Sequence, residues 1–297
     1  MPSKVLITGA EGQLGRVLQQ RLGNSFNLIP TAKSPSEMAI KKRSVRKVDI
    51  MDLSSIESCV EIENPDIIIN CAAMTNVDAC EENHALAHEI NVVGVQNIIK
   101  ATSKRVKIIQ MSTDYVFEGK DGPYCETSPT HPISYYGRSK LEAENILRGA
   151  LHPYSIIRGS VLYGDSLNTK SNFFAWVYDS LSKNKNIKVV TDQTSNPTWL
   201  QSLSDAIMKM ILLNGEGVYH FGSDDYLNRY DFAVLIATVF GFDTNLIAPA
   251  TSDSMPFIAR RPVHSGLKTK KISEQLNVIT LPTIEYLKMI RKQILVT

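Results

Sequence analysis

A tyrosine and a lysine stand four residues apart, at Tyr136 and Lys140, in a segment whose apolar residues recur at helical spacing. Residues with this separation lie one turn apart on the same face of an α-helix, so the phenol and the ammonium are expected to be neighbours. A free phenol loses its proton at about pH 10, and a nearby cation stabilises the phenolate and lowers that pKa. The pair therefore predicts proton transfer to a substrate oxygen, with Tyr136 as the donor.

Two hydroxyl residues, Ser112 and Thr113, end the apolar run that begins at Val106. The run predicts a buried strand, and α/β sheets bind ligands at the carboxyl ends of their strands. Neighbouring side chains of a strand point to opposite faces, so only one of the two hydroxyls is expected to reach a substrate. We favour Thr113 as the hydrogen-bond partner of a substrate carbonyl, with Ser112 as the competing candidate.

A glycine-rich turn near the N-terminus predicts a dinucleotide site. Val5 to Thr8 has the pattern of a buried strand, and Gly9, Gly12 and Gly15 follow in a G-x-x-G-x-x-G turn that leads into a segment of helical periodicity. Glycine permits positive φ and close approach of the backbone to a pyrophosphate, whose charge meets N–H groups and the helix dipole. Gly23 is expected to end this helix in a left-handed conformation.

The segment from Phe26 to Ser34, which includes the expected second strand, contains no acidic residue. NAD-preferring sites usually have Asp or Glu at the end of that strand to bind the ribose 2′-hydroxyl. Lys33 could instead bind a 2′-phosphate. The sequence therefore favours NADPH, and NADH stays open because Lys33 could equally be an ordinary surface lysine.

Short β-branched runs alternate with helical segments in the first half of the chain, which predicts an α/β fold with a doubly wound parallel sheet of Rossmann type. Further strands are expected over Asp66 to Ala73 and Tyr154 to Arg158, and a long helix over Glu81 to Ser103. Gly217 to Phe221 is one more apolar strand, which we expect to return to the same sheet.

The alternation loosens after about residue 165, where glycine and proline separate shorter elements. We expect residues 1–165 to form an NAD(P)-binding Rossmann domain, with a returning segment near 197–222. Residues 166–196 and 223–297 are expected to form a smaller, C-terminal substrate-binding lobe.

Composition narrows the classes of function. A formal net charge of +2 on 297 residues does not favour a nucleic-acid partner. Apolar runs are too short for a membrane span, and the N-terminus has no secretory pattern, so a cytoplasmic protein without a membrane partner is expected. The cysteines show no metal-ligand spacing, and His84 and His88 have no evident third ligand, so no metal site is expected.

With these motifs the sequence resembles the extended short-chain dehydrogenase/reductase family, and within it the dTDP-4-dehydrorhamnose reductase branch. The resemblance covers nearly the whole chain and rests on Gly9 to Gly15, Asn70 to Asp78, Ser112 to Gly119, Tyr136 to Lys140, Asn172-Phe173, Asp192-Gln193, Pro197-Thr198, Gly217 to His220 and Arg261-Pro262. It implies an NAD(P)H-dependent oxidoreductase that reduces a nucleotide-linked 4-keto-6-deoxy sugar, in dTDP-L-rhamnose and polysaccharide biosynthesis.

The resemblance also implies roles for individual residues. Thr113, Tyr136 and Lys140 would form the catalytic triad. Besides Lys33, Tyr136 and Lys140, the cofactor would contact Gly9, Gly12, Gln13, Leu14 and Gly15 at the pyrophosphate, Asp49 and Ile50 at the adenine, and Ala72, Ala73 and Thr75 at the nicotinamide ribose. Val77, Tyr115 and Asn172 would face the sugar nucleotide.

The sequence leaves other interpretations of its function open. Val161 stands where the branch has tryptophan, and His264 and Lys268 stand where it has Asn and Asp, so the particular sugar and base are open. The β subunit of methionine adenosyltransferase resembles the same branch, which makes an NADP-binding regulatory subunit the main alternative. An epimerase or dehydratase is less favoured because Asp114 is the one carboxylate beside Thr113. The oligomeric state is open, with a homodimer as one option.

Overall fold

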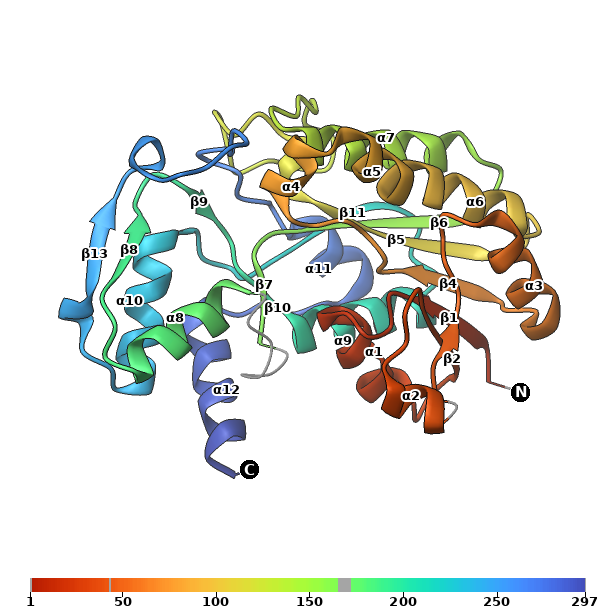
Figure 1. Ribbon diagram of the computed structural model, residues 1–297, viewed down its shortest axis with the longest axis horizontal. Coiled ribbons are helices and arrows are strands. Elements are labelled where there is room, and N and C mark those ends of the chain that lie inside the picture. The colour runs from red at the N-terminus through yellow and green to blue at the C-terminus, as the bar shows by residue number, and fades with distance from the viewer. Residues whose placement is uncertain (1, 43, 165–171, 297) are drawn as a thin grey trace.

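The computed structural model describes residues 2–42, 44–164 and 172–296. Its elements form two neighbouring regions, a large parallel sheet with helices on both faces and a smaller group of helices and short strands (Figure 1). The predicted α/β fold of Rossmann type is confirmed.

Seven strands form the large sheet, and all neighbours run parallel. In order across the sheet they are β11 (Gly217–Phe221), β6 (Tyr154–Gly159), β5 (Lys107–Thr113), β4 (Ile67–Asn70), β1 (Lys4–Thr8), β2 (Asn27–Ala32) and β3 (Arg46–Lys47). The chain runs outward from β1 to β3 and then crosses back to β4, so the strand order reverses between β1 and β4. Such a reversal opens a crevice at the carboxyl ends of the strands. The expected return of Gly217–Phe221 to this sheet is confirmed, because β11 pairs with β6.

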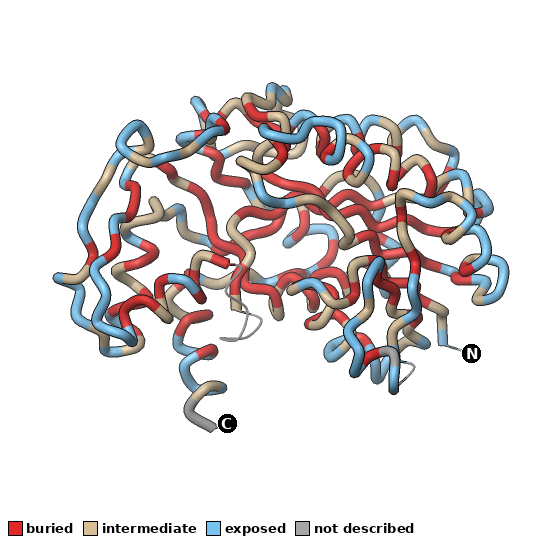
Figure 2. The backbone as a smooth tube through the Cα atoms, viewed as in Figure 1, coloured by how far each residue is buried: buried red, intermediate tan, exposed pale blue. Residues whose placement is uncertain are grey.

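Helices cover both faces of the sheet because its strands are apolar on both sides. Figure 2 shows the buried residues concentrated along these strands, and β5 is buried over its whole length. One face is packed by α1 (Gln13–Leu22), α9 (Leu200–Leu212) and α11 (Lys270–Leu276). The other is packed by α3 (Leu53–Glu63), α6 (Gly94–Ala101) and α7 (Tyr135–Gly149), and the short α2 (Glu37–Lys42) follows β2.

The long helix that the sequence predicted over Glu81 to Ser103 is confirmed from His84 to Ala101, but it begins later than predicted and contains a π-helical turn. It consists of α5 (His84–His88), the π-helical turn (Glu89–Val93) and α6, and the separate α4 (Val77–Glu82) precedes it. Asn83 makes the break, because its side chain accepts a hydrogen bond from the N–H of Leu86 at 3.0 Å and so begins a new helix. Asparagine competes with the helical backbone in this way, and apolar periodicity does not report it.

The end of α1 also differs from the prediction. Gly23 has a φ of −59°, in the right-handed helical region, so the expected left-handed conformation is wrong. A Cβ at this position would lie 2.8 Å from the carbonyl oxygen of Gln19, so glycine is needed here for space rather than for positive φ.

The smaller region has its own apolar core. Its elements are β7 (Leu162–Tyr163), α8 (Phe173–Ser182), β8 (Ile187–Val190), β9 (Thr194–Ser195), β10 (Thr198–Trp199), β12 (Leu227–Asn228), α10 (Arg229–Phe240), β13 (Ile247–Ala250) and α12 (Thr283–Val296). Aromatic rings fill much of this core, as between Tyr178 and Phe240, whose centroids are 5.1 Å apart. The division into a cofactor domain and a substrate lobe stays our proposal. Although α11 lies within residues 223–297, which were expected to form the lobe, it packs on the large sheet.

A buried ionic network fixes α7 on the sheet. Glu144 of α7 is fully buried and accepts two hydrogen bonds from Arg158 of β6, at 2.9 and 2.7 Å. It also accepts a hydrogen bond from Ser112 Oγ of β5 at 2.6 Å, and Arg148 adds a further contact at 2.7 Å. One carboxylate therefore joins α7 to two strands, and this position determines where Tyr136 and Lys140 lie.

Replacing Glu144 with alanine should strongly destabilise the fold. Arg158 is 1% exposed, so the variant leaves a buried charge without its carboxylate, a change that typically costs about 3–5 kcal/mol. Glu142→Ala is the control on the same helix, because Glu142 is exposed and its contact with His88 spans 3.5 Å. Urea denaturation measures the free energy of unfolding of both variants. If Glu144→Ala lowered that free energy as little as Glu142→Ala does, the role assigned to Glu144 would be contradicted.

Candidate active site

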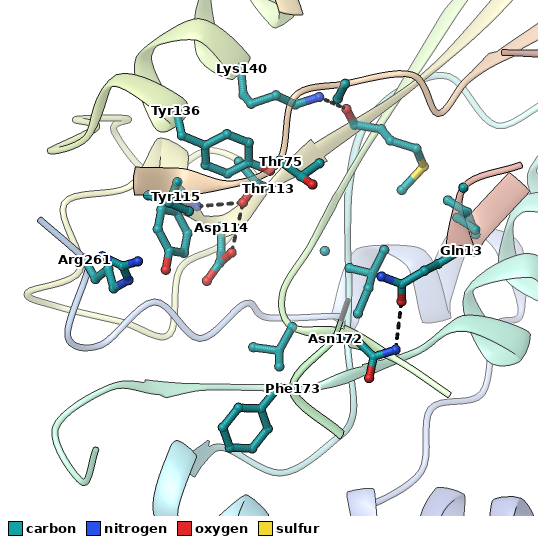
Figure 3. Close-up of a pocket in the computed structure, with 18 of the residues that line it drawn as sticks. Gln13, Thr75, Thr113, Asp114, Tyr115, Tyr136, Lys140, Asn172, Phe173 and Arg261 are labelled. Atoms are coloured by element: carbon teal, nitrogen blue, oxygen red, sulfur yellow. Dashed lines mark hydrogen bonds between the residues drawn. The ribbon is translucent and has the colours of Figure 1, made fainter. Parts of the chain in front are cut away.

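A cleft of about 910 Å³ opens at the carboxyl ends of the central strands and continues between the two regions. The glycine turn after β1 lines one end, the residues that follow β5 and the start of α7 line the middle, and α8, β8 and α10 line the other end. Figure 3 shows these side chains converging on the same space from elements far apart in sequence.

The glycine turn fits an anionic group. Gly9 has a φ of +62°, and a Cβ there would lie 2.8 Å from the backbone nitrogen of Ala72. Glycine is therefore needed both for its backbone conformation and for the close approach of Ala72. Gly12 precedes the first residue of α1 in an extended conformation and provides no side-chain cap. The first backbone N–H groups of α1 therefore meet no capping side chain, which suits a pyrophosphate.

The predicted cofactor residues divide into two groups. Those that line the cleft are Gly9, Gly12, Gln13, Leu14, Gly15, Ala73, Thr75, Tyr136 and Lys140. Lys33, Asp49, Ile50 and Ala72 are not among the lining residues. Lys33 Nζ lies 3.1 Å from Asp49 Oδ2, and Ile50 is buried with its side chain over Gly94 of α6. The roles predicted for these four residues stay predictions.

The three predicted catalytic side chains meet in the middle of the cleft. Tyr136, Thr113 and Lys140 are all buried, and the Tyr136 hydroxyl lies near the Thr113 side chain. Lys140 Nζ donates to the carbonyl of Met111 at 2.7 Å, and Thr113 Oγ1 donates to Asp114 Oδ1 at 3.1 Å. The competing hydroxyl of Ser112 is engaged with Glu144, so the strand separates the two hydroxyls as expected.

Burial sets the protonation of this group. It raises the pKa of Tyr136, an effect that the nearby Thr113 hydroxyl opposes. The sequence had predicted a lowered pKa from the Lys140 cation, and desolvation overrides that expectation because a buried phenolate loses its hydration. Burial lowers the pKa of Lys140 to about 8, against an opposing effect of the Glu144 carboxylate. At neutral pH Tyr136 therefore carries a proton that it can donate.

The residues expected to face a substrate also line the cleft. Val77 lies at the start of α4, and the ring of Tyr115 meets that of Tyr136 edge-on with centroids 5.7 Å apart. Asn172 caps α8 and donates at 3.0 Å to Oε1 of Gln13, the residue that follows the glycine turn.

Three basic residues at the far end of the cleft were not predicted as site residues. Arg229 has its guanidinium 5.3 Å from the ring centroid of Phe173, and Lys188 is exposed on β8. Arg261 forms a two-pronged ion pair with Asp78, at 3.0 and 2.7 Å. Arg261 fell inside a motif that carried the family resemblance, whereas nothing in the local sequence distinguishes Arg229 or Lys188 from other surface residues.

Asp114 is a buried carboxyl that the sequence had marked only as the neighbour of Thr113. Ser160 Oγ donates to it at 3.0 Å, and Ser265 and Thr113 also donate. Burial raises the pKa of Asp114, while these hydroxyl donors oppose the shift. Asp114 thus joins the end of β5 to the segment after β6 and to a loop near the C-terminus.

The described residues hold no group of three or more His, Cys, Asp or Glu side chains arranged to bind a metal ion. Over the same residues, no helix combines the length and apolar character needed to cross a bilayer.

Known proteins match this chain over nearly its whole length. The family model for the RmlD substrate binding domain matches residues 3–294. The chain is 34% identical to a dTDP-4-dehydrorhamnose reductase of Aggregatibacter actinomycetemcomitans, with 93% of this chain and 94% of that protein covered. It is 31% identical to the spore coat polysaccharide biosynthesis protein SpsK of Bacillus subtilis, with 92% and 91% covered.

A solved structure agrees with this match. The crystal structure of dTDP-4-dehydrorhamnose reductase from Bacillus anthracis in complex with NADP superimposes with a TM-score of 0.87, at 31% identity and with 100% of both chains covered. The chain therefore belongs to the RmlD substrate binding domain family, as a full-length homologue of NAD(P)-dependent dTDP-4-dehydrorhamnose reductases.

Proposed function

We propose that this protein is an NADPH-dependent reductase of a nucleotide-linked 4-keto-6-deoxy sugar, and that its substrate is dTDP-4-dehydrorhamnose. The observation that carries the proposal is the meeting of Tyr136, Thr113 and Lys140 midway between an anion-binding glycine turn and a basic far end of one cleft. The first end suits a dinucleotide and the second a nucleotide sugar, so the reacting carbonyl would lie beside Tyr136.

The residues of the cleft divide the chemistry between them. A bound dihydronicotinamide would supply the hydride that reduces C4 of the sugar. Tyr136 gives its hydroxyl proton to the C4 oxygen, and the charge that develops on Tyr136 is stabilised by the Lys140 ammonium. Thr113, whose hydroxyl donates to Asp114, turns that proton toward the substrate oxygen when that oxygen needs a second donor.

The far end of the cleft supports a diphosphate-linked substrate. Arg229 and Lys188 add positive charge there, whereas the charge of Arg261 is balanced by Asp78. Guanidinium groups bind phosphate oxygens through paired N–H donors. Tyr115 and Phe173 add aromatic surface next to Arg229. This combination suits a phosphorylated sugar better than a neutral ketone.

The direct test measures NADPH consumption with dTDP-4-dehydrorhamnose and with other nucleotide-linked 4-keto sugars. Turnover with the first, at higher kcat/KM than with the others, supports the proposal. An absence of turnover with every sugar, together with tight NADP binding and co-purification of a partner enzyme, would favour the regulatory subunit instead.

Tyr136→Phe should lower kcat by at least about 100-fold, because the variant keeps the ring but removes the donated proton. The dissociation constant for NADPH should change little. Tyr135→Phe is the matched control, since Tyr135 precedes it on α7 but stacks on His84 outside the cleft, with ring centroids 3.8 Å apart. Near-normal turnover in Tyr136→Phe would refute the role of general acid.

Lys33→Ala should shift the cofactor preference toward NADH. Lys33 is paired with Asp49, so its removal exposes a carboxylate that repels a 2′-phosphate and accepts hydrogen bonds from a 2′-hydroxyl. We expect the ratio of kcat/KM for NADPH to that for NADH to fall about tenfold, equivalent to ~1.4 kcal/mol. Lys100→Ala, at an exposed position on α6, is the control. An unchanged ratio would show that Lys33 does not contact the phosphate.

The buried ammonium of Lys140 should appear in the pH dependence of stability. Its pKa of about 8 lies below that of an unfolded lysine, so between the two values the unfolded chain binds more protons and the free energy of unfolding rises with pH. Relative to Lys140→Met, the native chain should gain about 1.4 kcal/mol per pH unit above pH 8, and ~3 kcal/mol in total. Urea denaturation over a series of pH values measures the free energy of unfolding of both proteins. If that free energy changed with pH in the same way in both, the lowered pKa of Lys140 would be contradicted.

A further inference from the structure

Residues 251–264, which we call the strap, pass from the smaller region to the large one and form part of the wall of the cleft. The strap follows β13, and Figure 1 shows the chain after β13 running toward α4. Three strap residues line the cleft, namely Met255, Phe257 and Arg261. Cζ of Arg261 lies 3.9 Å from the centroid of the Phe257 ring, so these two side chains form one surface.

Hydrogen bonds fix both ends of the strap. At its first end, Ser252 donates to the Asp192 carboxylate through its N–H at 2.9 Å and through its hydroxyl at 2.8 Å. At its last end, the N–H of His264 donates to the carbonyl of Gly119 at 2.7 Å. Pro262 packs so closely on Gly119 that a Cβ there would have no room. The two ends can therefore stay in place while the middle moves.

The middle of the strap is held by one carboxylate, that of Asp78 on α4. Its Oδ1 accepts the N–H of Ile258 at 3.1 Å and that of Ala259 at 2.9 Å. The Arg261 guanidinium donates to both carboxylate oxygens, at 3.0 and 2.7 Å, and so holds the pKa of Asp78 below its usual value. Within the described part of the chain, residues 255–261 make no other hydrogen bond to a different element.

The contact with Asp78 is favourable, yet it is accessible to water. Hydrogen bonds to a charged group favour the held state of the strap by about tenfold to 100-fold. The Asp78 side chain is 28% exposed, so water can replace the strap as its partner. Ile258, at the centre of the strap, is already 56% exposed, so its release from Asp78 adds little apolar surface there.

We propose that the strap is a gate over the substrate end of the cleft, and that Asp78 is the positioning residue that holds it closed. A released strap takes Phe257 and Arg261 away from the cleft and opens a path for a ligand as large as a nucleotide sugar. A held strap returns this surface to the ligand. The proposal rests on the proposed function for the identity of the ligand, whereas the release of the strap depends on Asp78.

Trypsin cleavage after Arg260 measures the release of the strap. Arg260 is exposed within the strap, and the rate of cleavage follows the population of open molecules. Asp78→Ala should speed this cleavage by about tenfold or more, because the strap loses a charged partner and the acceptor of two backbone N–H groups. Cleavage after Lys288 of α12 is the internal reference for general unfolding and should not change. Glu82→Ala is the control on α4, because Glu82 is exposed.

The KM for the nucleotide sugar should rise in Asp78→Ala. A ligand that binds to the held state alone loses affinity in proportion to the fraction of molecules in that state. The KM for the sugar should therefore rise by a factor similar to that of the cleavage rate, and by a larger factor than kcat falls. The KM for NADPH should stay nearly unchanged, because the glycine turn lies at the other end of the cleft. Added nucleotide sugar should slow cleavage of the native protein after Arg260.

Asp78→Asn decides the matter if Asp78→Ala does not fold, because asparagine keeps an oxygen for the two N–H groups and loses the charge. Equal cleavage rates after Arg260 in the native protein and in these variants would overturn the proposal. A rise of both KM values by the same factor would also overturn it, because that result indicates a general loosening of the site. Faster cleavage after Arg260 in Asp78→Ala, without turnover of any nucleotide sugar in the native protein, would support the gate and refute the proposed function instead.

Discussion

The attachment of α7 to the carboxyl end of β5 is the constraint on which the site depends. A buried ammonium needs an acceptor, and Lys140 finds it in the carbonyl of Met111. One turn further along α7, Glu144 is held by Ser112 of the same strand and by Arg158 of the next. These contacts fix both the position of α7 along its axis and its rotation about that axis, so Tyr136 lies beside Thr113. Removal of either contact would move Tyr136 relative to the strand.

A buried carboxyl group, that of Asp114, lies among the residues that line the cleft. Asp114 receives hydroxyl donors from Thr113, Ser160 and Ser265, which lie in three separate segments of the chain. Three neutral donors stabilise a buried carboxylate less than a direct ion pair would, and the pKa of Asp114 is raised accordingly. The orientation of the Thr113 hydroxyl is thereby linked, through Asp114, to the loop that carries Ser265.

The parts of the molecule that follow from local chemistry were predictable from the sequence, and those that depend on long-range contacts were not. The positive φ of Gly9 was predictable because glycine adopts that conformation without strain. The proximity of Tyr136 and Lys140 was predictable from their spacing on a helix. The break at Asn83 and the right-handed Gly23 depend on how a side chain or a carbonyl is used in three dimensions. Arg229 was missed for the same reason, because its place in the cleft is decided by the packing of α10 rather than by its sequence neighbours.

The two ends of the cleft differ in how they recognise a ligand, and this difference bears on specificity. The glycine end uses backbone N–H groups and a turn geometry that most neighbouring side chains cannot alter. The far end uses side chains from several elements of the smaller region, among them Val161, whose φ of +49° is rare for a β-branched residue. Such strain persists only where the surroundings enforce it. Substitutions at this end therefore change the shape of the cleft without disturbing Tyr136, which is held on the large sheet by α7.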